Sequence, residues 1–340
     1  MERGLYYRHM MNLSDTAQEL VARGKGILAA DESFSTADKR LIEYGIEPSE
    51  EMRRKFRDLF LATPGIEQYL SGVILYEETL EQNADNGVPF AKLLANEDVL
   101  PGIKVDQGLD EFPDSPEETI TKGLIGLPER LAEYRDTYGA RFTKWRAAIR
   151  IEGDRLPTSA VLVENAKRLA SYACEVQKAG MVPMVEPEVL LEGAHSRVRA
   201  REVVETTLHV LFDALAEQNV DLSGVILKTS MVLSGNKSGR RDTPEEVAED
   251  TLAVLLATVP KEVPGIVFLS GGQEPDQATE NLAAITARAK EVNAPWPLTF
   301  SYARALQEET LAAWQGKEDQ VEAARAVFIE RLRKVCQALV

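Results

Sequence analysis

The chain has 340 residues, and 44% of them are hydrophobic, so it is long enough to bury a sizeable core in one large α/β domain or two smaller ones. Its formal net charge is −16, from 39 Lys and Arg against 55 Asp and Glu. This acidic balance argues against nucleic acids and anionic membranes as partners, and any phosphate site would need a local basic cluster.

The cysteines and histidines show no pattern of a disulfide framework or a metal site. Cys174 and Cys336 lie in helix-like segments without a CxxC pair, so we expect reduced thiols in a cytoplasmic protein. His9, His195 and His209 form neither an HxH nor an HExxH spacing, so we expect no metal. We also expect no signal peptide and no membrane span, because no apolar run is long enough.

Short apolar runs that are typical of buried strands alternate with helical patterns along the chain. A helix begins after Ser49, another over 160–179 stops at Gly180, and a capping box at Thr243 opens a third that reaches residue 259. Further helical patterns cover 199–217, 276–292 and 305–314. The strand-like runs are centred near Leu28, Ile74, Ile103, Trp145, Val185, Ile226, Val267 and Phe300.

This alternation predicts parallel strands joined by right-handed crossovers. Eight strand–helix units indicate a (β/α)8 TIM barrel. The alternative is an open doubly wound sheet, but no GxGxxG follows the first strand. Because no linker divides the chain, we expect a single domain over 1–340. Its barrel core would cover about 24–315, after an N-terminal extension and before a C-terminal helix at about 318–339.

Polar or charged residues stand at the end of every predicted strand. In a barrel these ends converge on one face, where the chemistry occurs. Each residue alone could be a solvated strand-end charge, but the mixture of acids and bases indicates pairing around a cavity. The set is Asp31, Glu77, Glu78, Asp106, Lys144, Arg146, Glu186, Glu188, Lys228, Ser270, Ser301 and Tyr302.

Lys228 ends a buried apolar run and has two possible fates. It is either a solvated charge or an amine held in a crowded site as a nucleophile toward a carbonyl. The polar and charged residues at the other strand ends favour the second interpretation.

Two clusters favour anion binding. Ser270, Gly271 and Gly272 follow the seventh strand, and Ala303 and Arg304 follow the eighth, where barrels often bind phosphate at backbone N–H groups and a helix N-terminus. The second cluster follows the first strand and is joined by a lysine of the third. It consists of Ser33, Thr36, Lys39, Arg40 and Lys104. Two such sites beside a reactive lysine predict a substrate with a phosphate at each end.

Eight collinear segments closely resemble the class I fructose-1,6-bisphosphate aldolases. The resemblance runs from about residue 15 to the end of the chain. It implies a barrel, a Schiff-base mechanism without metal or cofactor, phosphorylated ketose and triose-phosphate substrates, and commonly a homotetramer. The segments are 24–33, 72–80, 102–106, 144–146, 185–188, 226–232, 268–273 and 300–307.

The resemblance assigns a role to each residue at the strand ends. Lys228 would attack carbon 2 of the ketose and become an iminium, with Lys144 and Arg146 disfavouring its charged form. Glu186 would shuttle protons with support from Glu188. Lys144 would also polarise the carbinolamine oxygen.

By the same resemblance, Asp31 would bind or deprotonate the carbon 4 hydroxyl, and Asp106 would help to hold the third-strand side of the site. The 1-phosphate would be held by Ser270, Gly271, Ala303 and Arg304, with Gly272, Ser301 and Tyr302 beside them, and the 6-phosphate by Ser33, Thr36 and Lys104 with Lys39, Arg40 and Arg304.

The sequence departs from animal members of the family at several points. Thr229 and Ser230 replace Pro-Asn, Ala303 replaces Gly, and the stretch at 33–36 differs from their small-residue turn. The chain ends at Val340 without the tail that ends in a tyrosine. Enamine protonation would then either become slow and limit turnover, or fall to a held water or another residue of the barrel mouth. We favour the second outcome, for which Tyr302 and Glu188 are the first candidates.

Three other functions are compatible with parts of the pattern. A related Schiff-base aldolase for another phosphorylated ketose would share the lysine. A catalytically silent barrel could act as a binding protein, although such a protein would be expected to have lost one of the catalytic residues. A metal-dependent aldolase is disfavoured by the number and spacing of the histidines.

Overall fold

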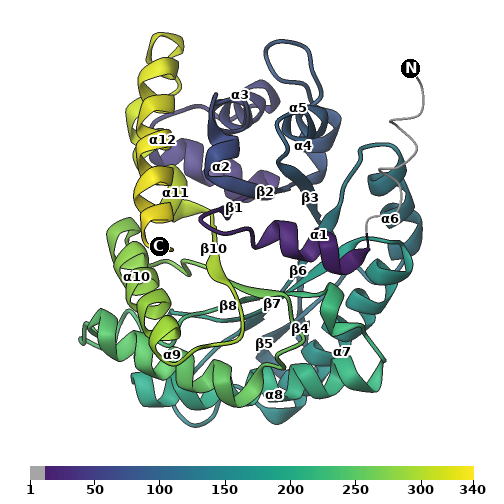
Figure 1. Ribbon diagram of the computed structural model, residues 1–340, viewed down its shortest axis with the longest axis vertical. Coiled ribbons are helices and arrows are strands. Elements are labelled where there is room, and N and C mark those ends of the chain that lie inside the picture. Colours follow the sequence, from purple (N-terminus) through teal and green to yellow (C-terminus); the bar gives the residue numbers. More distant parts are fainter. Residues whose placement is uncertain (1–11) are drawn as a thin grey trace.

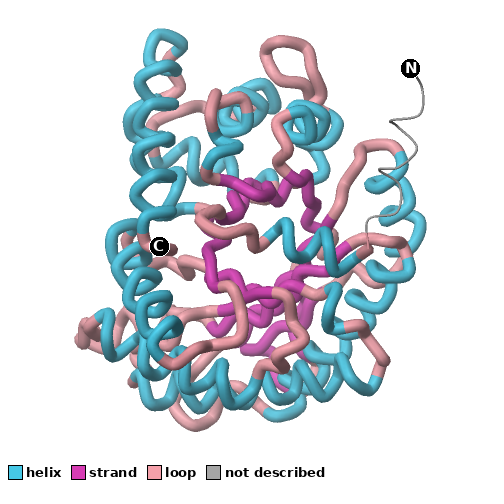
Figure 2. Tube along the Cα trace, in the orientation of Figure 1, coloured by secondary structure: helices cyan, strands magenta, loops and turns pink. Residues whose placement is uncertain are grey.

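The computed structural model describes residues 12–340 as a barrel of eight parallel strands surrounded by helices (Figures 1 and 2). The strands close in the order β1-β10-β9-β8-β7-β6-β3-β2, so the (β/α)8 prediction is confirmed and the open sheet is excluded. Each predicted strand centre falls within an observed strand. These are β1 Gly26–Ala30, β2 Leu70–Leu75, β3 Leu100–Lys104, β6 Phe142–Ile149, β7 Val182–Val189, β8 Ile226–Thr229, β9 Gly265–Phe268 and β10 Leu298–Tyr302.

The long helices begin and end close to the predicted positions. Thr243 and Glu246 form the reciprocal bonds of a capping box, and the side chain of Ser49 accepts a hydrogen bond from the N–H of Met52. Gly180 has φ +75°, as a helix stop requires. The helices are α1 Leu13–Leu20, α2 Phe34–Glu43, α3 Glu50–Leu61, α4 Glu77–Glu81, α5 Phe90–Asn96, α6 Leu127–Asp136, α7 Ser159–Lys178, α8 Arg197–Glu217, α9 Pro244–Thr258, α10 Pro275–Glu291, α11 Arg304–Trp314 and α12 Val321–Gln337.

Several short elements around the strand ends were not predicted. α2, α4, α5 and α6 have at most ten residues each, so each is too short to repeat a helical apolar pattern over several turns. An antiparallel hairpin of β4 Leu109–Phe112 and β5 Ser115–Thr121 interrupts the segment between β3 and β6. Much of this hairpin is exposed and acidic, which is why no strand pattern was visible.

The hydrophobic core has two layers. Inside the barrel, Phe142 packs with Ile74 and Met184, and a Cβ added at Gly102 would lie 2.3 Å from the Phe142 ring. α1 lies across the N-terminal end of the barrel, where its Leu20 joins the same cluster (Figure 1). A larger layer fills the space between strands and outer helices. The filled interior blocks passage through the barrel, and the polar residues at the carboxyl ends of the strands make that end the expected place for a site.

α12, which corresponds to the predicted C-terminal helix, packs on α3, α10 and α11. Arg331 binds Glu309 of α11 and Asp276 of α10, and Arg325 binds Asp58 of α3 at 2.8 Å. Within residues 12–340, no helix combines the length and the hydropathy that crossing a bilayer would need.

Candidate active site

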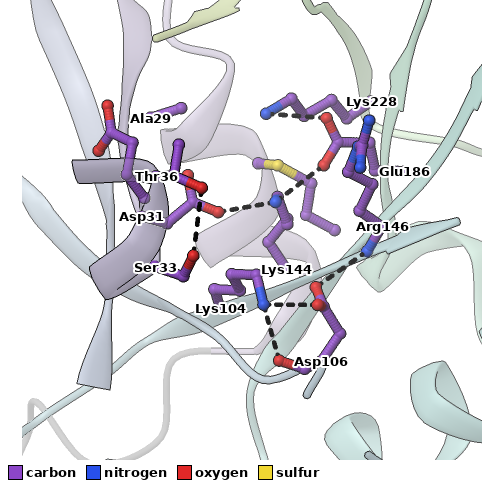
Figure 3. Close-up of polar contacts among 12 residues, drawn as sticks. Ala29, Asp31, Ser33, Thr36, Lys104, Asp106, Lys144, Arg146, Glu186 and Lys228 are labelled. Carbon is purple, nitrogen blue, oxygen red and sulfur yellow. Dashed lines mark hydrogen bonds and ion pairs between the residues drawn. The ribbon is translucent and has the colours of Figure 1, made fainter. Parts of the chain in front are cut away.

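Four charged side chains meet at the carboxyl ends of the strands (Figure 3). Lys228 Nζ lies 3.1 Å from Glu186 Oε1, and Lys144 Nζ lies 3.1 Å from Glu186 Oε2. Lys144 Nζ also contacts Asp31 Oδ2 at 2.7 Å. The side chains come from β8, β7, β6 and the end of β1, so the barrel brings together four positions that are far apart in the sequence.

All four groups are almost completely removed from water, and their charges balance. Their side chains are between 4% and 11% exposed. Two ammonium groups face two carboxylates, which avoids the cost of an unpaired buried charge.

The carboxylates of this site stay ionised at neutral pH. Burial would raise the pKa of Asp31, but the positive charges of Lys144 and Lys228 outweigh it and lower this pKa to about 2. Burial likewise opposes ionisation of Glu186, whose pKa is lowered because Lys144, Lys228 and Arg146 surround it. The pKa of Lys144 is raised, since Asp31 and Glu186 together overcome its burial. Lys144 therefore remains a fixed cation beside the amine of Lys228.

The amine of Lys228 has a carboxylate as its direct ion partner. The direct ion partner of its amine is the carboxylate of Glu186, and Arg146 is bound to Glu188 instead. The same carboxylate binds Lys144 through its other oxygen, so the two amines lie on either side of Glu186. The geometry instead puts a proton acceptor, Glu186 Oε1, within hydrogen-bond reach of the amine.

The third strand contributes a second ion pair at the edge of the site. Lys104 Nζ donates to the carbonyl oxygen and to Oδ1 of Asp106, at 2.7 and 2.5 Å. Asp106 Oδ2 accepts from the N–H of Arg146 at 3.3 Å. These groups, with Asp31 and Lys144, line a cavity of about 550 Å³. The cavity is thus large enough to hold a phosphorylated sugar.

The predicted 1-phosphate residues lie at the ends of two neighbouring strands, since β9 pairs with β10. Gln273 N donates to Ser270 O at 3.0 Å and closes a turn whose central residues, Gly271 and Gly272, have φ +57° and +90°. Only glycine adopts both conformations without strain. Arg304 is exposed in the first turn of α11, after Ala303. The turn and this helix start can present free N–H groups to an anion.

The predicted 6-phosphate residues divide into two groups. Ser33 and Thr36 lie at the start of α2 with their hydroxyl oxygens 3.2 Å apart, and both line the cavity. Lys39 is exposed on α2. Arg40 is buried, and its guanidinium donates to Glu32 and Gln307. The guanidinium of Arg40 therefore already binds protein groups beside the site.

Tyr302 does not face the site. It is fully buried, and its hydroxyl donates to the carbonyl of Ala278 on α10 at 3.0 Å. Successive side chains of a strand point to opposite faces, so Ser301 points inward and Tyr302 outward. Within residues 12–340, the hydroxyl oxygen of Ser301 has no hydrogen-bond partner. The suggestion that Tyr302 protonates the enamine is therefore wrong.

Sequence reasoning missed several residues of the cavity and its wall. Tyr76, Arg130 and Tyr134 line the cavity, and Tyr134 donates to Glu77 at 2.9 Å. Glu32 accepts from Arg57 at 2.7 Å as well as from Arg40. Most of these residues lie in the short helices and loops without clear periodicity. Glu77 was visible as a strand-end acid, but its partner was not.

The comparisons with known proteins all find fructose-bisphosphate aldolases. A model of the class-I fructose-bisphosphate aldolase family matches residues 12–340. A probable class 1 fructose-bisphosphate aldolase of Xanthomonas campestris pv. campestris is 51% identical over 302 residues, which are 89% of each chain. The cytoplasmic isozyme of fructose-bisphosphate aldolase from Spinacia oleracea is 47% identical over 93% of this chain and 89% of its own. The fructose-bisphosphate aldolase from Plasmodium falciparum, solved in complex with TRAP and a small-molecule inhibitor, superimposes with a TM-score of 0.93 at 45% identity. That match covers 96% of this chain and 93% of the other.

Proposed function

The chain belongs to the class I fructose-bisphosphate aldolase family, and we propose that Lys228 is its Schiff-base nucleophile. The protein is a metal-independent lyase of glycolysis. It reversibly cleaves fructose 1,6-bisphosphate to dihydroxyacetone phosphate and glyceraldehyde 3-phosphate. The observation that supports the assignment most strongly is the Glu186 carboxylate, which lies between the amines of Lys144 and Lys228 at 3.1 Å from each.

The first half of the reaction forms the iminium. Glu186 takes a proton from the Lys228 ammonium, and the free amine attacks carbon 2 while the fixed charge of Lys144 stabilises the developing oxygen. Glu186 returns this proton to the oxygen, which becomes the carbinolamine hydroxyl, and then accepts a second proton from the nitrogen. Glu186 passes the second proton to the hydroxyl, which leaves as water. The nitrogen of Lys228 is now doubly bonded to carbon 2 and carries a positive charge. Glu188, held by Arg146, supports Glu186 from the next inward position of β7.

The second half breaks the bond between carbons 3 and 4. Asp31 accepts the proton of the carbon 4 hydroxyl, so glyceraldehyde 3-phosphate leaves as the aldehyde. The bonding electrons move to carbon 3 and into the iminium, which becomes an enamine. Protonation at carbon 3 and addition of water to the regenerated iminium then release dihydroxyacetone phosphate. Because the pKa of Asp31 is lowered to about 2, the side chain is ionised at neutral pH, which a proton acceptor requires.

The phosphate contacts follow from the same orientation of the sugar. The turn at Ser270–Gln273 and the start of α11 would hold the 1-phosphate on the Lys228 side. Ser33, Thr36 and Lys104 would hold the 6-phosphate beyond Asp31. Figure 3 supports this arrangement, because Ser33 and Thr36 lie beside Asp31 and across the mouth from Lys228.

A substrate panel with and without a chelator tests the function. Fructose 1,6-bisphosphate should be cleaved at an unchanged rate in excess chelator, and Lys228→Ala should show no cleavage. Preferential cleavage of fructose 1-phosphate or of a seven-carbon bisphosphate would favour an aldolase for another ketose. Loss of activity in chelator, or no activity toward any of these sugars, would contradict the proposal.

We further propose that the whole chain is one domain and works as a cytoplasmic homotetramer. Relatives named as cytoplasmic or cytosolic isozymes from Spinacia oleracea and Arabidopsis thaliana support the location. The tetramer is supported by the state common in the family. Light scattering on purified protein should give about four times the chain mass of 37.6 kDa. A mass of one chain at micromolar concentration would refute it.

A further inference from the structure

An aromatic side chain lines the cavity beside the proposed 6-phosphate site. Tyr76 follows β2 and lines the same cavity as Ser33, Thr36 and Asp31. β1 and β2 are neighbours whose last residues, Ala30 and Leu75, are paired. The loops after these two strands therefore flank one side of the mouth, and the Tyr76 ring forms part of its boundary.

The Tyr76 ring is held by a second aromatic ring. Phe34, the first residue of α2, contacts it edge to face, with ring centroids 5.2 Å apart and an interplanar angle of 86°. Phe34 is 46% exposed, so its ring is accessible from solvent as well as packed on Tyr76. Its ring also lies under the guanidinium of Arg53, whose carbon is 5.0 Å from the centroid. We call Phe34, Arg53 and Tyr76 the aromatic wall.

Arg53 is fixed from three directions. Its Nε and Nη2 donate to the two oxygens of Glu78 at 3.0 and 2.8 Å, and its Nη1 donates to Asp38 at 3.0 Å. Arg53 belongs to α3, Asp38 to α2 and Glu78 to α4. One guanidinium thus ties together the three helices that carry the wall. Phe34 thus packs against the Tyr76 ring and is itself held by Arg53.

Given the proposed aldolase function, on which this inference rests, we propose that the aromatic wall limits the length of the aldehyde phosphate that this site accepts. Tyr76 is the specificity-determining residue, and Phe34 and Arg53 position it. A three-carbon aldehyde extends from Asp31 to the hydroxyls of Ser33 and Thr36. A four-carbon aldehyde carries its phosphate one carbon further, and to fit it must displace the braced ring of Tyr76.

The condensation reaction tests this directly. Dihydroxyacetone phosphate is supplied with either D-glyceraldehyde 3-phosphate or D-erythrose 4-phosphate, and the ratio of kcat/KM for the longer aldehyde to that for the shorter is measured. We expect Phe34→Ala and Tyr76→Ala to raise this ratio about tenfold, the effect of a small change in a shaped pocket. Phe34→Tyr, which keeps the ring, should retain the wild-type ratio. Ile42→Ala removes a 60% exposed apolar side chain from the same helix outside the cavity and should also retain it.

Two further measurements keep the outcome decisive. Thermal unfolding verifies that each variant is folded, and Arg53→Lys loosens the wall without removing a ring, so its ratio should also rise. A ratio that stays within twofold of wild type in folded Phe34→Ala and Tyr76→Ala, or that falls, overturns the aromatic wall while leaving the aldolase function intact. Failure of the wild-type protein to condense either aldehyde would overturn the proposed function itself.

Discussion

Among single residues, Glu186 has the most demanding position, since its two oxygens face different lysines. One oxygen can take the proton that Lys228 must lose before it attacks a carbonyl. The other faces Lys144, the cation that stabilises the developing oxygen. The two lysines therefore stabilise the ionised carboxylate, and its contact with the Lys228 amine allows proton transfer.

Replacement of Glu186 by Gln should lower kcat/KM for cleavage by roughly 100- to 10,000-fold, the usual contribution of a general acid–base group. The amide keeps the size of the side chain but cannot accept the proton of Lys228, so iminium formation should slow in parallel. Rapid-quench trapping with borohydride measures that step. Glu188→Gln, whose partner is Arg146, is the matched control and should cost much less. Iminium formation at the wild-type rate in Glu186→Gln would transfer the role to another group.

The depressed pKa of Asp31 predicts a pH-dependent contribution to stability. The pKa falls from an ordinary 3.8 to about 2 in the folded protein, so ionised Asp31 stabilises the fold above about pH 4. The contribution is about 2 kcal/mol by linkage and is lost as the pH falls toward about 2. In urea unfolding, the stability difference between wild type and Asp31→Asn should be constant from about pH 5 to 8 and shrink below about pH 4. A difference independent of pH over the whole range would contradict this assignment.

At the scale of elements, the sequence predicted what local signals determine. The strands are short apolar runs, and the long helices have visible caps such as Thr243. The direction of Tyr302 could have been predicted as well, because it adjoins inward-facing Ser301 on a strand. The hydrogen bond of the Arg40 guanidinium to Gln307 could not have been predicted, because the two residues lie 267 positions apart in the sequence. Such pairings are set by the closure of the barrel and leave no local pattern.

The turn after β9 is an element whose backbone serves the site. Gly272 has φ +90° with no atom within 4 Å of an added Cβ, and Gly180 has φ +75° with equally open space at the other end of the barrel. Alanine at either position should therefore cost a similar amount of stability, about 1 kcal/mol of backbone strain. Only Gly272→Ala should raise KM for fructose 1,6-bisphosphate, by about tenfold, because the turn would bind the 1-phosphate. Equal KM values in the two variants would show that the turn is purely structural.

For the whole molecule, the barrel concentrates its cations where the surrounding surface cannot provide them. The net charge is −16, yet Lys104, Lys144 and Arg146 line one cavity, and Lys228 shares the Glu186 carboxylate with Lys144. Each of these cations is matched by a nearby carboxylate, so the site is stable without substrate. An incoming phosphate meets this local charge after passing an acidic surface, and parallel strand ends are the feature of the fold that makes this possible.

The central claim is that, of all the lysines in the molecule, Lys228 alone forms the covalent intermediate. The most direct measurement is incubation with dihydroxyacetone phosphate, reduction with borohydride, and mass spectrometry of the complete peptide map. We predict one adduct per chain, on Lys228, formed equally well in excess chelator and absent from Lys228→Ala. An adduct on Lys144 or Lys104, or full cleavage activity in Lys228→Ala, would contradict the mechanism.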